Sequence, residues 1–270
     1  MDKRHPLPAG TLPYSVAKAP PGGDRQRGID RVIGVLELLL RRRHPMSAGD
    51  IARALGAPRS TVYELVNRLL DAQMLEPAGA EGQVFFGRSM HLFGAAYLQA
   101  DAGMRRVGEA LDWLGAETGA TVQCCTRRGD KYVVLDCRDG TGAFRITSEI
   151  GAEVPLPWTA SGRVLLGHLT DEAIRVLIPP EDLSLPDGHS LPMEQFLDDI
   201  ARARRDGFSQ TTGLASSYTW CQAVPVRGRA GVPDYTLCFV LPIDSTDAQR
   251  ARCLSLLTER ARLLSHASGD

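Results

Sequence analysis

The 270-residue chain is 43% hydrophobic and 23% charged, a composition that supplies one or two buried cores beneath a charged surface. Its 31 Lys and Arg residues nearly balance 32 Asp and Glu residues, so the net charge of −1 does not by itself indicate binding to nucleic acid or membranes. No apolar run approaches the roughly 18 to 20 residues that span a bilayer. Up to Arg88, however, 13 cations face 9 acids, whereas the remainder has 18 cations and 23 acids.

Six cysteines without a CxxC spacing do not form a disulfide framework, and the only adjacent pair is Cys124 and Cys125. A reducing compartment, the cytoplasm, is therefore expected. Residues 1–24 are rich in proline and glycine and lack the apolar segment of a secretory signal, which predicts a disordered tail.

The first ordered element is predicted to be a helix from about Gly28 to Arg43, because apolar residues recur at helical spacing and Pro45 follows. The predicted buried stripe of this helix consists of Ile29, Val32, Ile33, Leu36, Leu39 and Leu40.

A helix-turn-helix followed by a wing is predicted next. Ser47 stands three residues before Asp50 as in a capping box, and Gly56 ends the short helix that follows. Pro58 suits the first turn of a third helix. The buried stripe of the third helix is predicted to consist of Val62, Leu65, Val66, Leu69 and Leu70. Two short strands around a glycine-containing loop in residues 75–87 predict the wing.

In such a motif the second of the paired helices enters the major groove of DNA through its N-terminal residues. Arg59, Ser60 and Thr61 occupy that end, where a guanidinium, hydroxyls and the positive helix terminus can meet phosphates or base edges. The other predicted DNA-binding residues are Ser47, Tyr63, Glu64 and Arg68. The alternative is a small three-helix core without a DNA role.

The remaining residues predict a connecting helix and then an α+β unit. The helix spans Arg88 to about Gly103, and the second unit alternates short strands with helices around a sheet. Strands are predicted over 121–125, 132–136, 143–147, 221–226 and 235–241, and helices over 104–118, 161–168, 171–177, 193–206 and 247–265.

Three segments, in this order, resemble IclR-family bacterial transcriptional regulators: Ile29–Leu39, Ile51–Tyr63 and Thr159–Leu166. The resemblance covers roughly Arg27 to His266. It implies an α+β fold of two domains, with a winged helix-turn-helix, a linker helix and a C-terminal GAF-like effector-binding domain with an antiparallel sheet. The corresponding boundaries are 1–24 for the tail, 25–88 for the DNA-binding domain, 89–103 for the linker and 104–270 for the effector-binding and oligomerisation domain.

One residue of the third helix departs from the family pattern. Glu64 stands where similar proteins usually have a basic residue. A carboxylate repels phosphate but accepts a hydrogen bond from cytosine N4, so the operator preference is expected to differ. The alternative, which the sequence favours equally, is that Glu64 faces solvent and contacts no base. Arg59 and Arg68 are then expected to provide more of the attraction to phosphates. Arg41–Arg43 either add to this attraction or serve only as a charge cluster at the C-terminus of their helix.

The resemblance also implies an effector site at Trp158–Arg163, where the amides of Ala160 and Ser161 would donate to a small organic ligand, often an acid. The Ser161 hydroxyl would add to them, and an ordinary helix cap is the alternative. On the facing strands, Cys221 matches a frequent cysteine, whereas similar proteins commonly have serines at Cys238 and Val240. The predicted aromatic wall consists of Tyr132, Phe144 and Trp158, and filling of the core is the alternative for the first two.

The alternatives to a DNA-binding regulator are an enzyme and a redox sensor. An enzyme has little support, because the sequence lacks a GxSxG elbow, a complete dinucleotide loop, a P-loop and an HExxH motif. A redox sensor is an alternative, because five cysteines fall on predicted strands of one domain. Against it, a free buried cysteine usually behaves as a small hydrophobic residue and does not react. These cysteines are Cys124, Cys125, Cys137, Cys221 and Cys238.

The sequence therefore predicts a ligand-responsive transcriptional regulator that acts as a repressor of a catabolic operon, with an activator as the alternative. Its partners are expected to be double-stranded operator DNA, a small organic acid, semialdehyde or aromatic effector, and further copies in a homodimer or homotetramer. No cofactor, no metal and no membrane contact are expected. The modest excess of four positive charges up to Arg88 makes more than one copy necessary for tight DNA binding.

Overall fold

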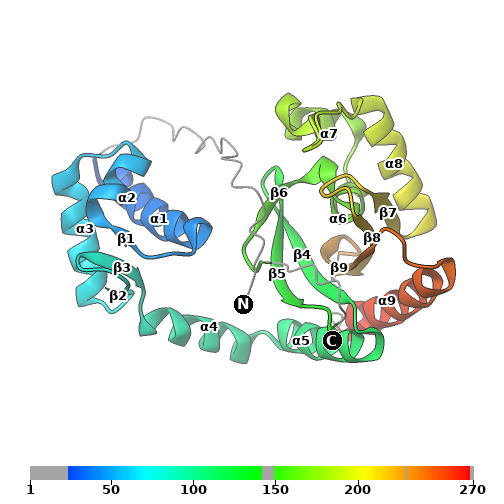
Figure 1. Ribbon diagram of the computed structural model, residues 1–270, viewed down its shortest axis with the longest axis horizontal. Helices are drawn as coiled ribbons and strands as arrows, with labels where there is room; N and C mark the ends of the chain where they lie inside the picture. Colours follow the sequence, from blue (N-terminus) through cyan, green and yellow to red (C-terminus); the bar gives the residue numbers. More distant parts are fainter. Residues whose placement is uncertain (1–23, 142–148, 229, 268–270) are drawn as a thin grey trace, which may run out of the picture. The chain divides into compact units, whose positions relative to one another are not determined.

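The computed structural model describes residues 24–141, 149–228 and 230–267 (Figure 1). The chain divides into two compact units, residues 1–91 and 92–270. Almost all of the predicted disordered tail, and the strand predicted over 143–147, lie outside the described residues. Within the described part of the chain, no helix combines the length and the apolar composition needed to cross a membrane.

The first unit is a three-helix core with a small antiparallel sheet. Its helices are α1 (Asp24–Arg42), α2 (Ala48–Leu55) and α3 (Arg59–Asp71), and its strands are β1 (Met46–Ser47), β2 (Leu75–Pro77) and β3 (Gln83–Phe86). The strand order is β1-β3-β2, so β2 and β3 form the predicted wing and β1 extends it. β1 was not predicted, because two residues are too few to show a strand period.

The buried face of α1 differs from the predicted stripe. Val35, Leu38 and Leu39 are buried against α2 and α3, whereas Ile29, Ile33 and Leu40 are 40–63% exposed. The prediction was wrong for these last three residues because helical spacing shows that an apolar stripe exists but not which side of it the neighbouring helices cover. In α3 the prediction was better, since Val62, Val66 and Leu69 are buried.

Two helices occupy the region of the predicted linker helix and of the helix predicted over 104–118. α4 (Arg88–Ala100) ends and α5 (Ala102–Thr118) begins at Asp101, whose carboxylate accepts a hydrogen bond from the Met104 amide at 3.0 Å. Arg105 donates to the last carbonyls of α4, those of Leu98 and Gln99. α4 has no buried residue, and its exposed large apolar side chains are Leu92, Phe93, Tyr97 and Leu98.

The second unit is built on a six-stranded antiparallel sheet in the order β6-β5-β4-β9-β8-β7. The strands are β4 (Thr121–Arg128), β5 (Lys131–Arg138), β6 (Glu153–Pro155), β7 (Ser209–Thr212), β8 (Thr219–Arg227) and β9 (Pro233–Pro242). The helices that follow α5 are η1 (Leu156–Trp158), α6 (Ala160–Leu166), α7 (Asp171–Leu177), η2 (Pro180–Leu183), α8 (Met193–Asp206) and α9 (Asp247–Ala267). The predicted α+β class and antiparallel sheet are confirmed, while the short edge strands β6 and β7 were not predicted.

Helices cover both faces of this sheet (Figure 1). α5 and α9 pack on the face that carries Trp220 and Val224 of β8. α6 packs on the opposite face, against Ala223 of β8 and Cys238 of β9. Because neighbouring strand residues point to opposite faces, the odd-numbered residues of β8 and the even-numbered residues of β9 line the α6 face. That face contains Cys221, Cys238 and Val240, three of the predicted effector residues.

Candidate functional site

Ser47 lies at the start of α2 and caps it. Its hydroxyl accepts from the Asp50 amide at 3.1 Å and donates to the Asp50 carboxylate at 2.8 Å. This hydrogen bond from Ser47, with a second from Arg53, lowers the pKa of Asp50. The hydroxyl predicted to contact DNA is thus engaged within the protein, as the capping-box pattern indicated.

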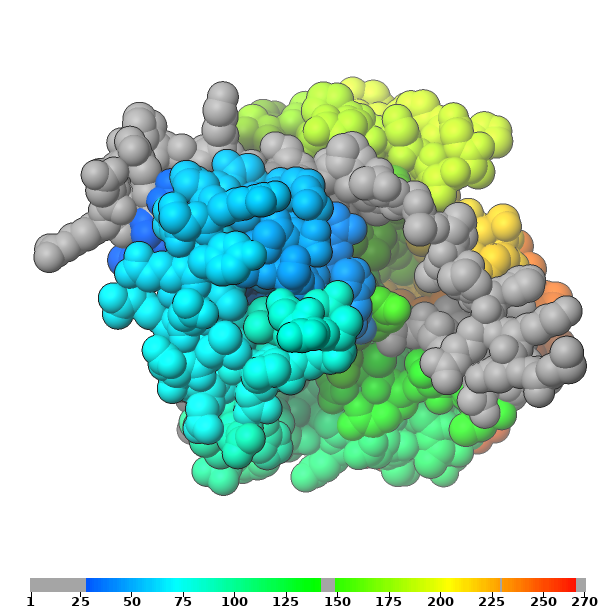
Figure 2. Space-filling model, turned by 60° about the vertical axis from the view of Figure 1, so that its left-hand side comes forward, coloured from blue at the N-terminus to red at the C-terminus, as the bar shows by residue number. Residues whose placement is uncertain are grey.

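The N-terminal end of α3 has no side-chain cap. Pro58 occupies the N-cap position, one residue before the predicted place, and provides no side-chain cap. Arg59 and Ser60 are exposed and Thr61 is half-buried, so the first turn presents free amides beside a guanidinium and hydroxyls. No ion pair of Arg59 is found among the described residues. Figure 2 shows the first unit (blue to cyan) from the side on which α3 lies.

The exposed side of α3 carries the other three predicted residues. Arg68 pairs with Glu64 at 3.3 Å, and both side chains are at least two-thirds exposed. Tyr63 is half exposed, and its hydroxyl lies close to Gly49 at the start of α2. Glu64 is therefore solvent-facing and partly neutralises Arg68, which leaves Arg59 as the unpaired cation of this surface.

The wing carries no cation of its own. Between Asp71 and Arg88 the only charged residues are Glu76 and Glu81, and Arg88 is paired with Glu76 at 2.6 Å. Gly79 turns the loop with φ of 75°, and a Cβ there would lie 2.7 Å from the Gln83 side chain. Among the described residues of this unit, the positive charge available to phosphates thus lies outside the wing.

The predicted effector residues that the structure describes come together on the α6 face, with one exception. Tyr132 of β5, Cys221 of β8, and Cys238 and Val240 of β9 lie on this face, and Ala160 and Ser161 form the first turn of α6. Trp158 is the exception: its indole nitrogen donates to the Asp182 carbonyl of η2 at 2.8 Å. Phe144 lies outside the described residues.

Two features of α6 determine what its first turn offers. The Thr159 side chain caps the helix by accepting from the Gly162 amide at 2.9 Å, which leaves the amides of Ala160 and Ser161 without a capping acceptor. Gly162 itself is packed so closely that an added Cβ would lie 2.1 Å from the Leu156 carbonyl oxygen. This position therefore requires glycine.

The Ser161 hydroxyl is fully buried and makes no hydrogen bond of acceptable geometry with any described atom. It lies against the thiols of Cys125 and Cys238. Tyr132 donates to the side-chain oxygen of Gln123, and the Cys125 thiol lies 2.8 Å from the Tyr132 hydroxyl. A group of uncharged polar side chains thus converges beneath α6.

Sequence reasoning gave no effector role to Gln123, Cys125, Asp199 or the side chain of Arg163. Gln123 and Cys125 share the α6 face of β4, and their period-two spacing within the predicted strand was the available signal. Arg163 and Asp199 form a buried ion pair at 3.0 Å that joins α6 to α8. Nothing in the sequence indicates this pairing, because 36 residues separate the two side chains.

The cysteines do not form one cluster. Cys124 faces α5 and α9, whereas Cys125, Cys221 and Cys238 face α6. Cys137 is only partly buried. Among the described residues there is no group of three or more potential ligands that could hold a metal ion.

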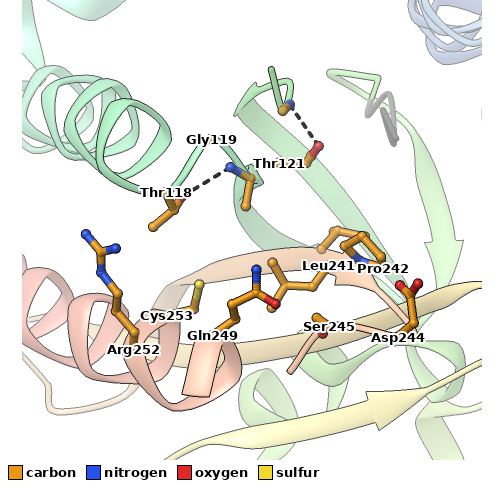
Figure 3. A pocket seen from close by; sticks show the side chains of 13 residues that line it. Thr118, Gly119, Thr121, Leu241, Pro242, Asp244, Ser245, Gln249, Arg252 and Cys253 are labelled. Carbon is orange, nitrogen blue, oxygen red and sulfur yellow. Dashed lines mark hydrogen bonds between the residues drawn. The ribbon is translucent and has the colours of Figure 1, made fainter. Parts of the chain in front are cut away.

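A cavity of about 500 Å³ lies elsewhere in the second unit (Figure 3). It is bounded by the turn between α5 and β4, the end of β9 and the start of α9. Its polar lining includes Gln249, Arg252 and Asp244, and its apolar lining includes Cys253 and Leu241. Only Val240 is shared with the predicted effector residues.

Comparison with known proteins gives consistent matches over both units. The family model "IclR helix-turn-helix domain" matches residues 28–79, and the model "Bacterial transcriptional regulator IclR C-terminal" matches residues 96–266. The chain is 29% identical over 180 residues to the HTH-type transcriptional regulator TtgV of Pseudomonas putida, covering 66% of this chain and 68% of the relative. It is 25% identical over 209 residues to the transcriptional repressor IclR of Escherichia coli, covering 76% of each chain.

The fold matches solved structures as well. A crystal structure of a transcriptional regulator from Alicyclobacillus acidocaldarius superposes with a TM-score of 0.82 at 20% identity, covering 90% of this chain and 99% of that one.

Proposed function

Because the chain belongs to the IclR family of bacterial transcriptional regulators, we propose that it represses a catabolic operon until a small organic effector binds its second unit. The observation that carries this proposal is the exposed, uncapped first turn of α3 with its unpaired Arg59. A helix terminus of this kind attracts phosphate, and the residues of the turn can reach base edges in the major groove.

In this proposal the two units have separate tasks. Residues 25–88 bind DNA, 89–103 link the units, and 104–270 bind the effector and further copies. Arg59, Ser60 and Thr61 contact DNA directly, with Tyr63 and Arg68 at the edge of the contact. Ser47 contributes by holding α2 in place, since its hydroxyl is already used by Asp50.

The proposed effector site is the α6 face of the sheet. Ala160 and Ser161 offer amides that the Thr159 cap does not use, and Cys221, Cys238 and Val240 form the facing wall. Tyr132 closes the site beside Cys125. Trp158 belongs to its edge, because its indole nitrogen is bound to the η2 backbone. Such a wall with a few convergent polar groups suits a small, partly apolar ligand.

Two exposed apolar surfaces support assembly into a homodimer or homotetramer. One lies on α1 at Ile29, Ile33 and Leu40, and the other on α4 at Leu92 and Phe93. Large apolar side chains gathered on one helix are costly to leave in water and are commonly covered by a partner. A second copy would also double the positive charge that faces the operator.

The effector acts by binding one arrangement of the subunits more tightly than the other, since only such a difference shifts an equilibrium. The arrangement favoured by the effector is proposed to separate the two recognition helices by a distance that no longer matches the operator. Release of DNA then follows from a change in spacing and requires no change in α3 itself.

The direct test is fluorescence anisotropy of the full-length protein on the DNA upstream of its own gene, at several salt concentrations. Sequence-preferring binding that weakens with salt is expected, and benzoate, 4-hydroxybutyrate or succinic semialdehyde should lower the affinity. Binding that does not distinguish this DNA from a scrambled duplex would overturn the assignment.

A further inference from the structure

The cavity of about 500 Å³ at one end of the sheet is separate from the proposed effector site. It lies between the turn that joins α5 to β4 and the segment that joins β9 to α9 (Figure 3). Of the described residues that line it, only Val240 also belongs to the proposed effector site. The cavity is large enough for a small ligand, and the residues around it indicate which class of ligand it fits.

One wall of the cavity is formed by the turn between α5 and β4. The Thr118 hydroxyl donates to the Leu114 carbonyl at 2.7 Å and accepts from the Ala120 amide at 3.2 Å. The Thr121 hydroxyl accepts from the Gly140 amide at 3.0 Å. Because both hydroxyls are engaged within the protein, this wall gives the cavity a fixed shape.

The opposite wall is held in place by Arg250. Its Nη2 donates to the Ile243 carbonyl at 2.6 Å, and its Nε donates to the Ser245 hydroxyl at 3.1 Å. The same guanidinium lies over the Trp220 ring, 4.7 Å from the ring centroid. Asp244 stands between the two residues that Arg250 binds, so its backbone is fixed at the edge of the cavity.

Asp244 and Arg252 place opposite charges at the two ends of the cavity. In Figure 3 these two side chains lie at opposite ends of a row in which Gln249 and Ser245 stand between them. Asp244 precedes α9, whereas Arg252 stands five residues after the first residue of that helix, a rise of about 7.5 Å. A ligand that contacts both side chains must therefore carry its own two charges well apart.

Both ends of the cavity have hydrogen-bonding capacity to spare. Among the described residues the Asp244 carboxylate has no hydrogen bond or ion pair. Arg252 uses Nη2 alone, which donates to the Glu117 carbonyl at 3.3 Å and to the Glu117 carboxylate at 3.4 Å. The Gln249 side-chain oxygen accepts from the Thr246 amide at 2.9 Å, which leaves the Gln249 amide nitrogen as a donor toward the cavity. Donors therefore lie near one end and an acceptor lies at the other.

We propose that this cavity binds a small ω-amino acid, with its carboxylate at Arg252 and Gln249 and its ammonium group at Asp244. Leu241 and Pro242 at the end of β9 belong to the apolar lining, along which the methylene chain of such a ligand would pack. A simple acid or a simple amine would use only one of the two charged ends. The inference concerns a second ligand and does not depend on the proposed effector site.

The test is isothermal titration calorimetry of the full-length protein with 5-aminovalerate, in the absence of DNA. Two matched probes each keep one charge: valerate lacks the amine, and pentylamine lacks the carboxylate. Since the Arg252 side chain is 62% exposed, each charged contact is partly screened. Each probe should therefore bind about fivefold more weakly than 5-aminovalerate.

Two variants assign the charges to their residues. Asp244→Asn should abolish the preference for 5-aminovalerate over valerate, and Arg252→Gln should abolish the preference over pentylamine. Arg262→Gln is the matched control, because it removes an exposed cation of α9 that does not line the cavity, and it should keep both preferences.

Wild-type protein that binds 5-aminovalerate no better than the two probes would overturn the proposal, as would preferences that survive in Asp244→Asn and Arg252→Gln. An absence of binding at millimolar 5-aminovalerate would do the same. Operator binding is measured separately. A protein that binds the operator but not 5-aminovalerate would contradict the cavity proposal alone, whereas the reverse result would contradict the proposed function alone.

Discussion

The Arg163 guanidinium donates from Nε and Nη2 to a single carboxylate oxygen of Asp199, each at 3.0 Å, and so joins α6 to α8. Its remaining nitrogen, Nη1, donates to the carbonyls of Pro157 and Thr159. Because these carbonyls belong to the segment that leads into α6, the ion pair holds the first turn of the proposed effector site.

Removing the acid from this pair should destabilise the second unit. Asp199→Ala leaves a guanidinium that is 98% buried without its counter-charge, and we expect a loss of about 3 kcal/mol in the free energy of unfolding by urea. Glu194→Ala is the control, because its pair with Arg175 is exposed and screened by solvent, so its loss should have a much smaller effect. Equal losses for the two variants would show that burial of Arg163 is not the cause.

Gly162 should not tolerate a methyl group. Gly162→Ala would place a Cβ 2.1 Å from the backbone oxygen of Leu156, which cannot rotate away, and we expect a loss of about 3 kcal/mol. The matched change is Gly94→Ala on α4, where the added Cβ meets nothing within 4 Å and should stabilise the helix by up to about 1 kcal/mol. Thermal unfolding of both variants measures the difference.

Arg59 should contribute a phosphate contact. For Arg59→Ala we expect weaker operator binding and a plot of log affinity against log salt that is shallower by about 0.9, the value for one lost contact. Arg175→Ala, which removes an exposed cation from the other unit, should leave the slope unchanged. An unaltered slope for Arg59→Ala would argue that the first turn of α3 lies away from the phosphates.

The Glu64 carboxylate should reduce the contribution of Arg68 to DNA binding. Glu64→Gln removes the carboxylate that holds Arg68 at 3.3 Å, so we expect tighter binding to non-specific duplex DNA and a salt slope steeper by about 0.9. A base contact from Glu64 would instead appear as weaker binding to the operator alone. Anisotropy on operator and scrambled duplexes distinguishes these outcomes.

The reactivity of Cys221 should depend on pH in a specific direction. Since hydrogen bonds from Cys238 and the neighbouring threonines lower its pKa, its thiolate persists to lower pH than that of an ordinary thiol, and it is lost as pH falls through the lowered value. Alkylation by iodoacetamide, followed by mass spectrometry, should therefore show a midpoint below about 8.5. Cys238→Ala should move the midpoint upward, and no movement would mean that Cys238 is not the donor.

Local signals in the sequence determined much of the fold. The Ser47–Asp50 cap, the left-handed Gly56 with φ of 59° and the proline before α3 specify the helix-turn-helix within about a dozen residues. α7 and α8 occupy the predicted ranges because Thr170 caps the first and Gly207 ends the second. Such signals act between residues a few positions apart, so they can be read without the tertiary structure.

The tertiary structure alone decided which side chains meet. Helical spacing placed Ile29 in a buried stripe, but the cover provided by α2 and α3 left it exposed. The alternation of side chains along a strand could place Cys221 and Cys238 on one face of the sheet, but only the β8–β9 register shows that they are diagonal neighbours. The packing of α6 on this face then brings the Ser161 hydroxyl beside them. Contacts of this kind depend on the packing of segments distant in sequence, which no local preference encodes.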